Sequence, residues 1–275
     1  MNAKPVLRLA KRALAIACCI VASAGSAQGT KTIINAAVET NYPPFEFMDP
    51  ESNKLVGFDV DVVNAIAAKM GMKVNLIESS FAQLIPSVVT KRVDVTLGGM
   101  GDLPERRTSI NLLDYVYDDT VFFTPRTNAA RFPNMDAMCG KRVAAVRSSL
   151  QPSWIRNWSD ENCSKVGKPA VIVVGTENTP DMRMALNQGR ADASISSAGV
   201  VRYQNTLEND RYMIVGQPIH RGILGIGFSK DDPDFGQAMK KALAALIADG
   251  TYQNLLQKWN LVGSGIERPM INGQP

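Results

Sequence analysis

Histidine and cysteine are scarce in this 275-residue sequence. It contains one histidine, His220, and four cysteines, two of which lie within the first 27 residues. Zinc centres and catalytic triads of the serine-protease type are built from several histidine, cysteine or carboxylate ligands at defined spacings. The sequence therefore argues against a zinc site and a histidine-based triad, and it predicts no cofactor and no catalytic residue.

The sequence also lacks a basic run. Its formal charge of +4 arises from 30 Lys and Arg residues against 26 Asp and Glu residues, and four of the basic residues lie in the N-terminal segment, which has no acid. The rest of the chain is close to neutral. Because phosphate binding needs clustered Lys and Arg side chains, we expect no nucleic acid partner.

The only long apolar run near the N-terminus is too short for a stable membrane-spanning helix. Four basic residues precede the run from Ala13 to Ala22, and small residues follow as far as Ala27. This order is typical of a secretory signal peptide, which we place at residues 1–27. Cys18 and Cys19 leave a lipoprotein as the alternative, but neither follows the expected aliphatic and small residues.

Two cysteines, Cys139 and Cys163, remain after removal of a signal peptide. A secreted chain enters an oxidising compartment, so we predict a disulfide between them, with two buried free thiols as the alternative. Closing a loop of this length stabilises the fold by about 3 kcal/mol in the chain-entropy model.

Short β-branched segments alternate with amphipathic helices along the mature chain, which predicts an α/β protein with largely parallel sheets. The last two predicted helices, Asp234–Asp249 and Thr251–Trp259, have the clearest periodicity, and the tail from Gly263 to Pro275 is expected to be loosely held. The predicted strands are Thr32–Val38, Lys73–Glu78, Val93–Leu97, Val121–Thr124, Arg142–Val146, Ala170–Val174, Ala193–Ile195, Tyr212–Val215 and Ile223–Ser229.

Two turn-rich stretches, Thr124–Asn128 and Gly216–Gly222, are candidate crossings between two lobes. We therefore predict one lobe from residues 28–124 and 222–263, a second from residues 125–221, and a C-terminal tail from residues 264–275. A small-molecule site is expected in the cleft between the lobes.

The stretch Glu39–Phe47 resembles a ligand platform. A predicted strand ends before it, two prolines exclude a helix, and the aromatic side chains of Tyr42, Phe45 and Phe47 accompany two acids. The alternative is that these aromatic side chains only fill a core beneath a turn.

The segment Asp94–Arg107 carries a second candidate feature. A strand leads into three glycines and then a short helix with Arg106 in its first turn. A cation is unfavourable at that end of the helix dipole, and a bound carboxylate would explain its presence. The alternative is an exposed arginine that pairs with Glu105 or Asp102. In the second predicted lobe, Ser148 and Ser149 follow a strand and offer donors to an anion or act as helix caps.

Nearly the whole mature chain resembles the periplasmic solute-binding proteins of polar amino-acid ABC importers. The segments that carry the resemblance are ETNYPPFEF with GFDVD, FAQLIPSV, VDVTLGGMGDLPERR, CGKRVAAVRSS, QGRADASI, and the C-terminal stretch from GILGIGFSK to LLQKWNL. The resemblance implies a type II periplasmic-binding-protein fold, in which two lobes joined by two crossings close on one ligand. It also implies a periplasmic monomer that delivers its ligand to an inner-membrane permease.

The resemblance places a ligand carboxylate on Arg106, beside the backbone N–H groups of Gly101 and Leu150. The remaining implied site residues are the aromatic walls Tyr42 and Phe81, the acid Glu39 near the ligand side chain, the backbone carbonyl of Gly99 for the ligand amine, and the second-lobe residues Ser149 and Ser197.

The sequence departs from the family pattern at several of these positions. Glycines stand at 98, 99 and 101 where serines are common, and Leu103 and Leu150 replace threonines. Ser197 stands where an aspartate usually pairs with the ligand ammonium. A buried ammonium without a counter-charge costs several kcal/mol. Either Glu39 replaces that aspartate, or the ligand lacks a free α-amine.

Two other functions use the same fold. The sequence resembles the cyclohexadienyl dehydratases, but those enzymes use a glutamate a few residues after the second-lobe turn, where this chain has Ser148–Pro152 without an acid. A ligand-sensing module for a separate receptor is the other alternative. We expect a binding protein that is not an enzyme.

Overall fold

The structure is a computed structural model that describes residue 1 and residues 32–147, 149–177 and 179–274. The predicted signal peptide, residues 1–27, and Ser148 lie outside the described residues, apart from Met1. The helices are Phe58–Lys69 (α1), Phe81–Val89 (α2), Pro104–Arg107 (α3), Gln151–Asn162 (α4), Thr179–Asn187 (α5), Ala198–Leu207 (α6), Pro233–Ala248 (α7) and Thr251–Lys258 (α8). Short 3₁₀ helices cover Arg126–Arg131, Met135–Met138 and Ser164–Val166.

The strands form one large sheet and one small one. They are Ile33–Val38 (β1), Asn41–Tyr42 (β2), Glu46–Met48 (β3), Leu55–Val56 (β4), Lys73–Glu78 (β5), Val95–Leu97 (β6), Asn111–Pro125 (β7), Arg142–Val146 (β8), Ile172–Thr176 (β9), Ala193–Ser197 (β10), Tyr212–Phe228 (β11) and Met270–Ile271 (β12). The large sheet has the order β5-β1-β6-β11-β7-β10-β8-β9, with β12 also paired to β7, and β2, β3 and β4 form the small sheet.

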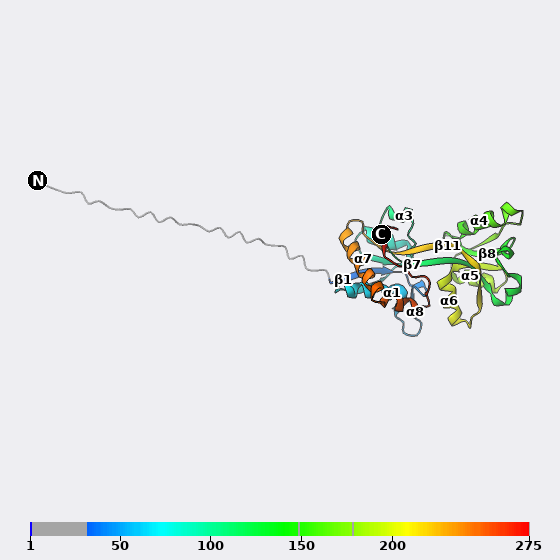
Figure 1. The fold of residues 1–275 in the computed structure, drawn as a ribbon, viewed down its shortest axis with the longest axis horizontal. Helices are drawn as coiled ribbons and strands as arrows, with labels where there is room; N and C mark the ends of the chain where they lie inside the picture. Colours follow the sequence, from blue (N-terminus) through cyan, green and yellow to red (C-terminus); the bar gives the residue numbers. More distant parts are fainter. Residues whose placement is uncertain (2–31, 148, 178, 275) are drawn as a thin grey trace. The chain divides into compact units, whose positions relative to one another are not determined.

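The large sheet is mixed, because two parallel groups flank an antiparallel centre. Strands β5, β1 and β6 pair in parallel on one side, and β10, β8 and β9 do so on the other. The long strands β7 and β11 pair antiparallel between them and extend from one group to the other (Figure 1). The prediction of an α/β fold is confirmed, while the expected parallel arrangement holds only within each group.

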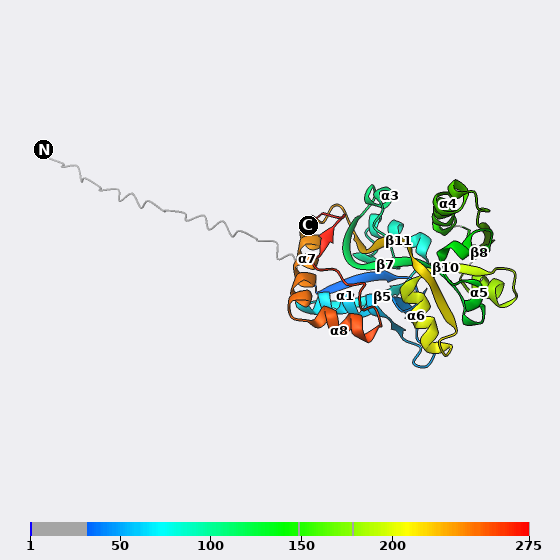
Figure 2. The ribbon, with the colours of Figure 1, turned by 45° about the vertical axis from the view of Figure 1, so that its right-hand side comes forward.

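Separate hydrophobic cores lie at the two ends of this sheet. One contains side chains from β1, α1, α7 and α8, including Ile34, Phe58 and Leu243, and the other contains side chains from β8 and α4, including Val143 and Ile155. Figure 2 shows α1, α7 and α8 together at one end and α4 and α5 at the other. Two cores joined by two strands are the organisation expected of a two-lobed protein.

The strands that join these cores differ from the sequence prediction. The stretch Thr124–Asn128 was expected to leave the first lobe, but β7 already pairs with β10 at Thr120 and continues to Pro125. On the return, β11 continues through Gly216–Gly222, with a register shift between Val215 and His220. The lobe boundaries remain a prediction, and the pairing with β10 would fit a first crossing a few residues earlier.

The platform stretch is anchored to the start of α1. The amide of Asp59 donates to the carbonyl of Phe45 at 2.9 Å, and the amide of Phe58 donates to Pro44 at 2.9 Å. Gly57 allows this approach, because its φ is +138° and a Cβ there would lie 2.0 Å from the carbonyl oxygen of Phe45. These hydrogen bonds from the first turn of α1 hold the loop in position.

The C-terminal tail is held against β7, so the prediction that it would be loose is wrong. Asn272 exchanges hydrogen bonds with Leu112 through its side-chain oxygen and its backbone amide, each at 2.9 Å. The amide of Gly273 donates to the carboxylate of Asp114 at 2.9 Å. Strand β10 pairs with β7 only between Thr120 and Phe123, and the tail supplies partners to the earlier part of β7.

The predicted disulfide is confirmed. Cys139 and Cys163 are joined with an S–S distance of 2.03 Å and a Cα–Cα distance of 5.6 Å. Cys163 lies in the core beneath α4. The bond therefore ties the end of α4 to the segment that precedes β8.

Replacing both cysteines with alanine should lower the free energy of unfolding by about 3 kcal/mol, because the unfolded chain loses a loop constraint. Urea unfolding followed by circular dichroism measures this change. Wild-type protein treated with a reductant should lose similar stability, while the double variant should not respond to the reductant. Equal stability of the wild type and the double variant would contradict the prediction.

Candidate functional site

The first group of predicted site residues leaves the sheet at one edge, because β1 and β6 are parallel neighbours. Val38 at the end of β1 pairs with Leu97 at the end of β6, and the amide of Glu39 donates to the carbonyl of Leu97 at 3.2 Å. The loops that follow these two strands therefore begin side by side. This is the edge at which open α/β sheets bind ligands.

Close packing explains the glycines at this edge. Gly99 has a φ of +55°, and a Cβ there would lie 2.5 Å from the ring of Tyr42. A Cβ on Gly98 would lie 2.4 Å from Leu84 and within 3.7 Å of Glu39 and Phe81. A serine side chain would collide with Leu84 at position 98 and with Tyr42 at position 99, so the glycines allow Leu84 and Tyr42 to approach the backbone.

Tyr42 forms one wall of this group. Its ring stacks on Phe45 with centroids 5.2 Å apart, and it lies against Gly99. Phe81, at the start of α2, is 43% exposed and lies next to Gly98. The structure thus brings Glu39, Tyr42, Phe81 and Gly99 together.

Arg106 joins the same group. Its Nη1 donates to the carbonyl of Gly101 at 2.8 Å, and its guanidinium carbon lies 5.4 Å from the ring centroid of Phe81. Among the residues that the structure describes, no carboxylate lies within ion-pair distance of Arg106. Burial lowers the pKa of Arg106 from its usual high value, while Glu105 nearby opposes that shift.

One alternative from the sequence analysis paired Arg106 with Glu105 or Asp102. In the structure, Asp102 does not form an ion pair with Arg106. The side chain of Asp102 is fully buried and accepts two hydrogen bonds from Arg107, at 2.6 and 2.7 Å. Arg107 therefore satisfies this acid. The partly buried charge of Arg106 remains available to a ligand.

The second-lobe residues Ser149 and Leu150 lie at the start of α4. The hydroxyl of Ser149 donates to the carbonyl of Val146 at 2.7 Å and accepts from the amide of Gln151 at 3.2 Å. Leu150 is 44% exposed. The described residues give no contact between this turn and the group around Arg106.

Ser197 lies elsewhere in the second lobe, at the end of β10. Its Oγ accepts the amide of Gly199 at 3.2 Å, which caps α6, and it donates to the carboxylate of Asp118. The hydroxyl of Tyr42 donates to the other oxygen of Asp118 at 3.2 Å. Ser197 is thereby linked to the platform through Asp118.

The sequence did not predict Asp118 as a site residue. Burial of its carboxyl group raises its pKa to about 6, although the hydrogen bonds from Ser197 and Tyr42 favour the ionised form. The residue lies in the middle of β7, beside Asp119. The absence of an acid at position 197 is the signal in the sequence that could have directed attention to Asp118.

Two further acids are fully buried: Glu46 within the platform and Asp59 in the first turn of α1. No residue in the described part of the chain forms an ion pair with either of them. Burial raises the pKa of Glu46 well above its usual value, and the nearby carboxyl of Asp59 raises it further. Burial also raises the pKa of Asp59. Both causes favour the protonated form of Glu46 more strongly in the folded protein than in the unfolded chain.

The pKa of Glu46 predicts how stability changes with pH. A carboxyl whose pKa is raised by folding contributes stability below its unfolded pKa, near 4.5, and loses that contribution as the pH rises toward the folded pKa. The wild type should therefore lose stability relative to Glu46→Gln between pH 4.5 and 7.5, by up to about 1.4 kcal/mol per pH unit.

Urea unfolding at four pH values across this range measures that difference. Glu51→Gln is the matched control, because Glu51 is exposed in the following turn. Its difference from the wild type should stay constant across the range. A constant difference for Glu46→Gln as well would show that Glu46 is ionised in the folded protein.

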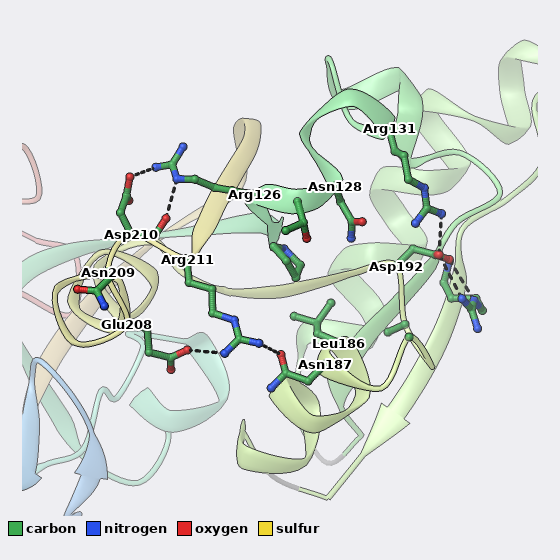
Figure 3. A pocket seen from close by; sticks show the side chains of 15 residues that line it. Arg126, Asn128, Arg131, Leu186, Asn187, Asp192, Glu208, Asn209, Asp210 and Arg211 are labelled. Carbon is green, nitrogen blue, oxygen red and sulfur yellow. Dashed lines mark hydrogen bonds and ion pairs between the residues drawn. The ribbon is translucent and has the colours of Figure 1, made fainter.

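A separate cavity of about 740 Å³ lies in the second half of the sheet and contains none of the predicted site residues (Figure 3). Its arginines are already paired: Arg126 with Asp210, Arg131 and Arg142 with Asp192, and Arg211 with Glu208. These contacts neutralise most of the positive charge in the cavity. Unlike Arg106, each of these arginines already has an acidic partner.

Within the described residues, no group of three or more His, Cys, Asp and Glu side chains is placed to hold a metal ion. No helix in that part of the chain is long and apolar enough to cross a membrane.

Comparisons with known proteins identify the class. Residues 34–262 match the bacterial extracellular solute-binding proteins, family 3. The match covers most of the chain, so the protein belongs to this family. Its relatives include amino-acid-binding components of ABC transporters.

Particular relatives agree with this class. The chain is 26% identical over 256 residues to an arginine-binding protein of Corynebacterium glutamicum, covering 93% of this chain and 83% of the relative. It is 26% identical over 240 residues to the lysine/arginine/ornithine-binding periplasmic protein of Escherichia coli K12, covering 82% and 86%. It is also similar to the solved structure of an ancestral arginine-binding protein bound to arginine, with a TM-score of 0.68, 26% identity, and coverage of 83% and 98%.

One similar solved structure is described as the precursor of an enzyme. The chain is similar, at 23% identity and a TM-score of 0.65, to an ancestral amino-acid-binding protein described as a precursor of cyclohexadienyl dehydratase, covering 82% of this chain and 95% of that one. At this identity the likeness shows the fold alone. The relatives named above are binding proteins.

Proposed function

We propose that this protein is the periplasmic substrate-binding component of an ABC importer for a polar amino acid. Residues 1–27 direct export and are removed. The lobes formed by residues 28–124 with 222–263 and by residues 125–221 close on one ligand, and the closed monomer delivers it to an inner-membrane permease. The two cores joined by β7 and β11 support this arrangement.

The proposal rests on the surroundings of the Arg106 side chain. It is a partly buried guanidinium with no ion pair among the described residues, hydrogen-bonded to the carbonyl of Gly101 and packed against Phe81. Arginine binds a carboxylate through two parallel hydrogen bonds. A ligand carboxylate would supply the counter-charge that this position lacks.

The surrounding residues suit an amino acid. Tyr42 and Phe81 would contact its two faces, and the carbonyl of Gly99 would accept from its amine. Ser149 and the amide of Leu150 would reach the carboxylate when the lobes close. Glu39 is half-buried, and burial raises its pKa, so a cationic ligand side chain would stabilise its ionised form. Arginine, lysine and ornithine, which the relatives are named for binding, carry such side chains.

Arg106→Ala should weaken binding of L-arginine, or of whichever amino acid binds best, by about two to three decades. This corresponds to roughly 3–5 kcal/mol, the cost of removing one partner from a buried pair. Isothermal titration calorimetry measures the change. Arg106→Lys should retain only part of the affinity, because an ammonium cannot form the two parallel bonds.

The matched control is Arg92→Ala, since Arg92 is exposed at the end of α2. This variant should bind as the wild type does. Unchanged affinity in Arg106→Ala, with a native melting profile, would exclude the assignment of Arg106 as the carboxylate anchor.

The proposal contains no catalytic step. The turn at Ser149–Pro152 lacks the glutamate that the dehydratases use, so the bound ligand would leave unchanged. Incubation with prephenate or arogenate should give no product above the uncatalysed rate, followed by absorbance and chromatography. Turnover that disappears in a pocket variant such as Arg106→Ala would reverse this conclusion.

A further inference from the structure

The acid that is missing at position 197 has a counterpart on the neighbouring strand. Ser197 occupies the end of β10 and pairs in register with Thr120 of β7. Asp118 lies two residues before Thr120, and its carboxylate accepts the hydroxyl of Ser197. The carboxylate that an aspartate at 197 would carry is thus present beside that position, on the neighbouring strand.

Two donors hold the carboxylate of Asp118 in place. Ser197 donates to one oxygen and Tyr42 to the other, the latter at 3.2 Å. A carboxylate has about four acceptor positions, so each oxygen retains capacity for another donor. Within residues 32–147, 149–177 and 179–274, no cation lies within ion-pair distance of Asp118.

Asp118 also lies near Gly101, the residue that Arg106 contacts. Gly222 pairs with Asp118 across β7 and β11, and Leu224, two residues further along β11, forms a bridge with Gly101. Two residues of a strand span about 7 Å. The position on β11 that pairs with Gly101 is therefore about 7 Å from the position that pairs with Asp118. Gly101 is the residue whose carbonyl accepts from Arg106.

Tyr42 links Asp118 to the backbone expected to receive an amine. Its ring lies against Gly99, and its hydroxyl donates to Asp118. Arg106 and Asp118 thus give the site a cation and an anion, each without an ion pair in the described residues. A zwitterion carries the complementary charges.

We infer that Asp118 is the carboxylate that binds the ligand's α-ammonium group, in place of the acid that Ser197 does not provide. The inference rests on the proposed function and deepens it, since it assigns the ligand class. The ligand is an α-amino acid with a free amine rather than an amine-free acid or an N-acyl derivative. Ser197 and Tyr42 act as positioning residues, and Glu39 is left to contact the side chain.

The test uses calorimetry with the standard L-amino acids and L-ornithine, followed by the 2-hydroxy acid analogue of the tightest binder. The wild type should bind the amino acid at least about 100-fold more tightly than the analogue, because only the amine can pair with Asp118. Asp118→Asn keeps the size of the side chain and one acceptor oxygen, while its amide nitrogen can donate where the other carboxylate oxygen accepted. It should weaken binding of the amino acid by a similar factor and leave binding of the analogue nearly unchanged.

Two further variants separate a binding role from a structural one. Asp119→Asn is the matched control on the same strand, where Asp119 faces Arg221 at 3.4 Å, and it should bind as the wild type does. The double variant Asp118→Asn with Ser197→Asp moves the carboxylate to the neighbouring strand. It should recover affinity for the amino acid to within about tenfold of the wild type.

Each contrary result has a distinct meaning. Tight binding of the amino acid by Asp118→Asn, or equal binding of the amino acid and its 2-hydroxy analogue by the wild type, would overturn the role of Asp118 while the proposed capture function stands. The comparison of the two ligands needs no variant, so it holds even if Asp118→Asn folds poorly. Failure of the wild type to bind any amino acid or analogue would overturn the proposed function and this assignment together.

Discussion

The antiparallel pairing of β7 with β11 is the constraint on which the rest of the structure depends. These two strands are the longest among the described residues, and they join the parallel group β5-β1-β6 to the parallel group β10-β8-β9. Each group has a core of its own, and the two strands run through the region between the cores. Asp118 lies in this middle stretch, where it can contact both Tyr42 and Ser197.

The site retains charges that the fold leaves without partners. Most acids and arginines near the second-half cavity are paired, as are Arg107 and Asp102 beside the platform. Arg106 and Asp118 are not paired with one another or with another charge in the described residues. A partly buried charge without a partner lowers stability, and a ligand of opposite charge recovers that energy on binding. The same argument explains why a zwitterion suits the site better than a neutral solute.

Local patterns were sufficient to predict much of the fold. The periodic helix pair near the C-terminus appears as α7 and α8 within one or two residues of the predicted limits, and the disulfide follows from two cysteines in an exported chain. Around the site, Glu39, Tyr42, Phe81, Gly99 and Arg106 were named from a strand end, prolines and glycines, and from family resemblance. The structure brings them together, because β1 and β6 are neighbours.

The remaining features depend on contacts between distant segments. The middle of β7 reads Tyr117-Asp118-Asp119, and β11 contains Gly216 and Pro218, so neither has the alternation that indicates a strand. Their pairing with each other creates both long strands. The ordered tail likewise depends on a part of β7 that β10 leaves open. Asp118 could not be recognised locally, because its partners are more than 70 residues away in the sequence.

A crystal structure of the protein with its bound amino acid tests the central claim most directly. The account predicts the ligand carboxylate on Arg106 and its ammonium within hydrogen-bonding distance, about 3.2 Å or less, of Asp118 and of the carbonyl of Gly99. A ligand with its carboxylate away from Arg106, or with no amine near Asp118, would contradict the account.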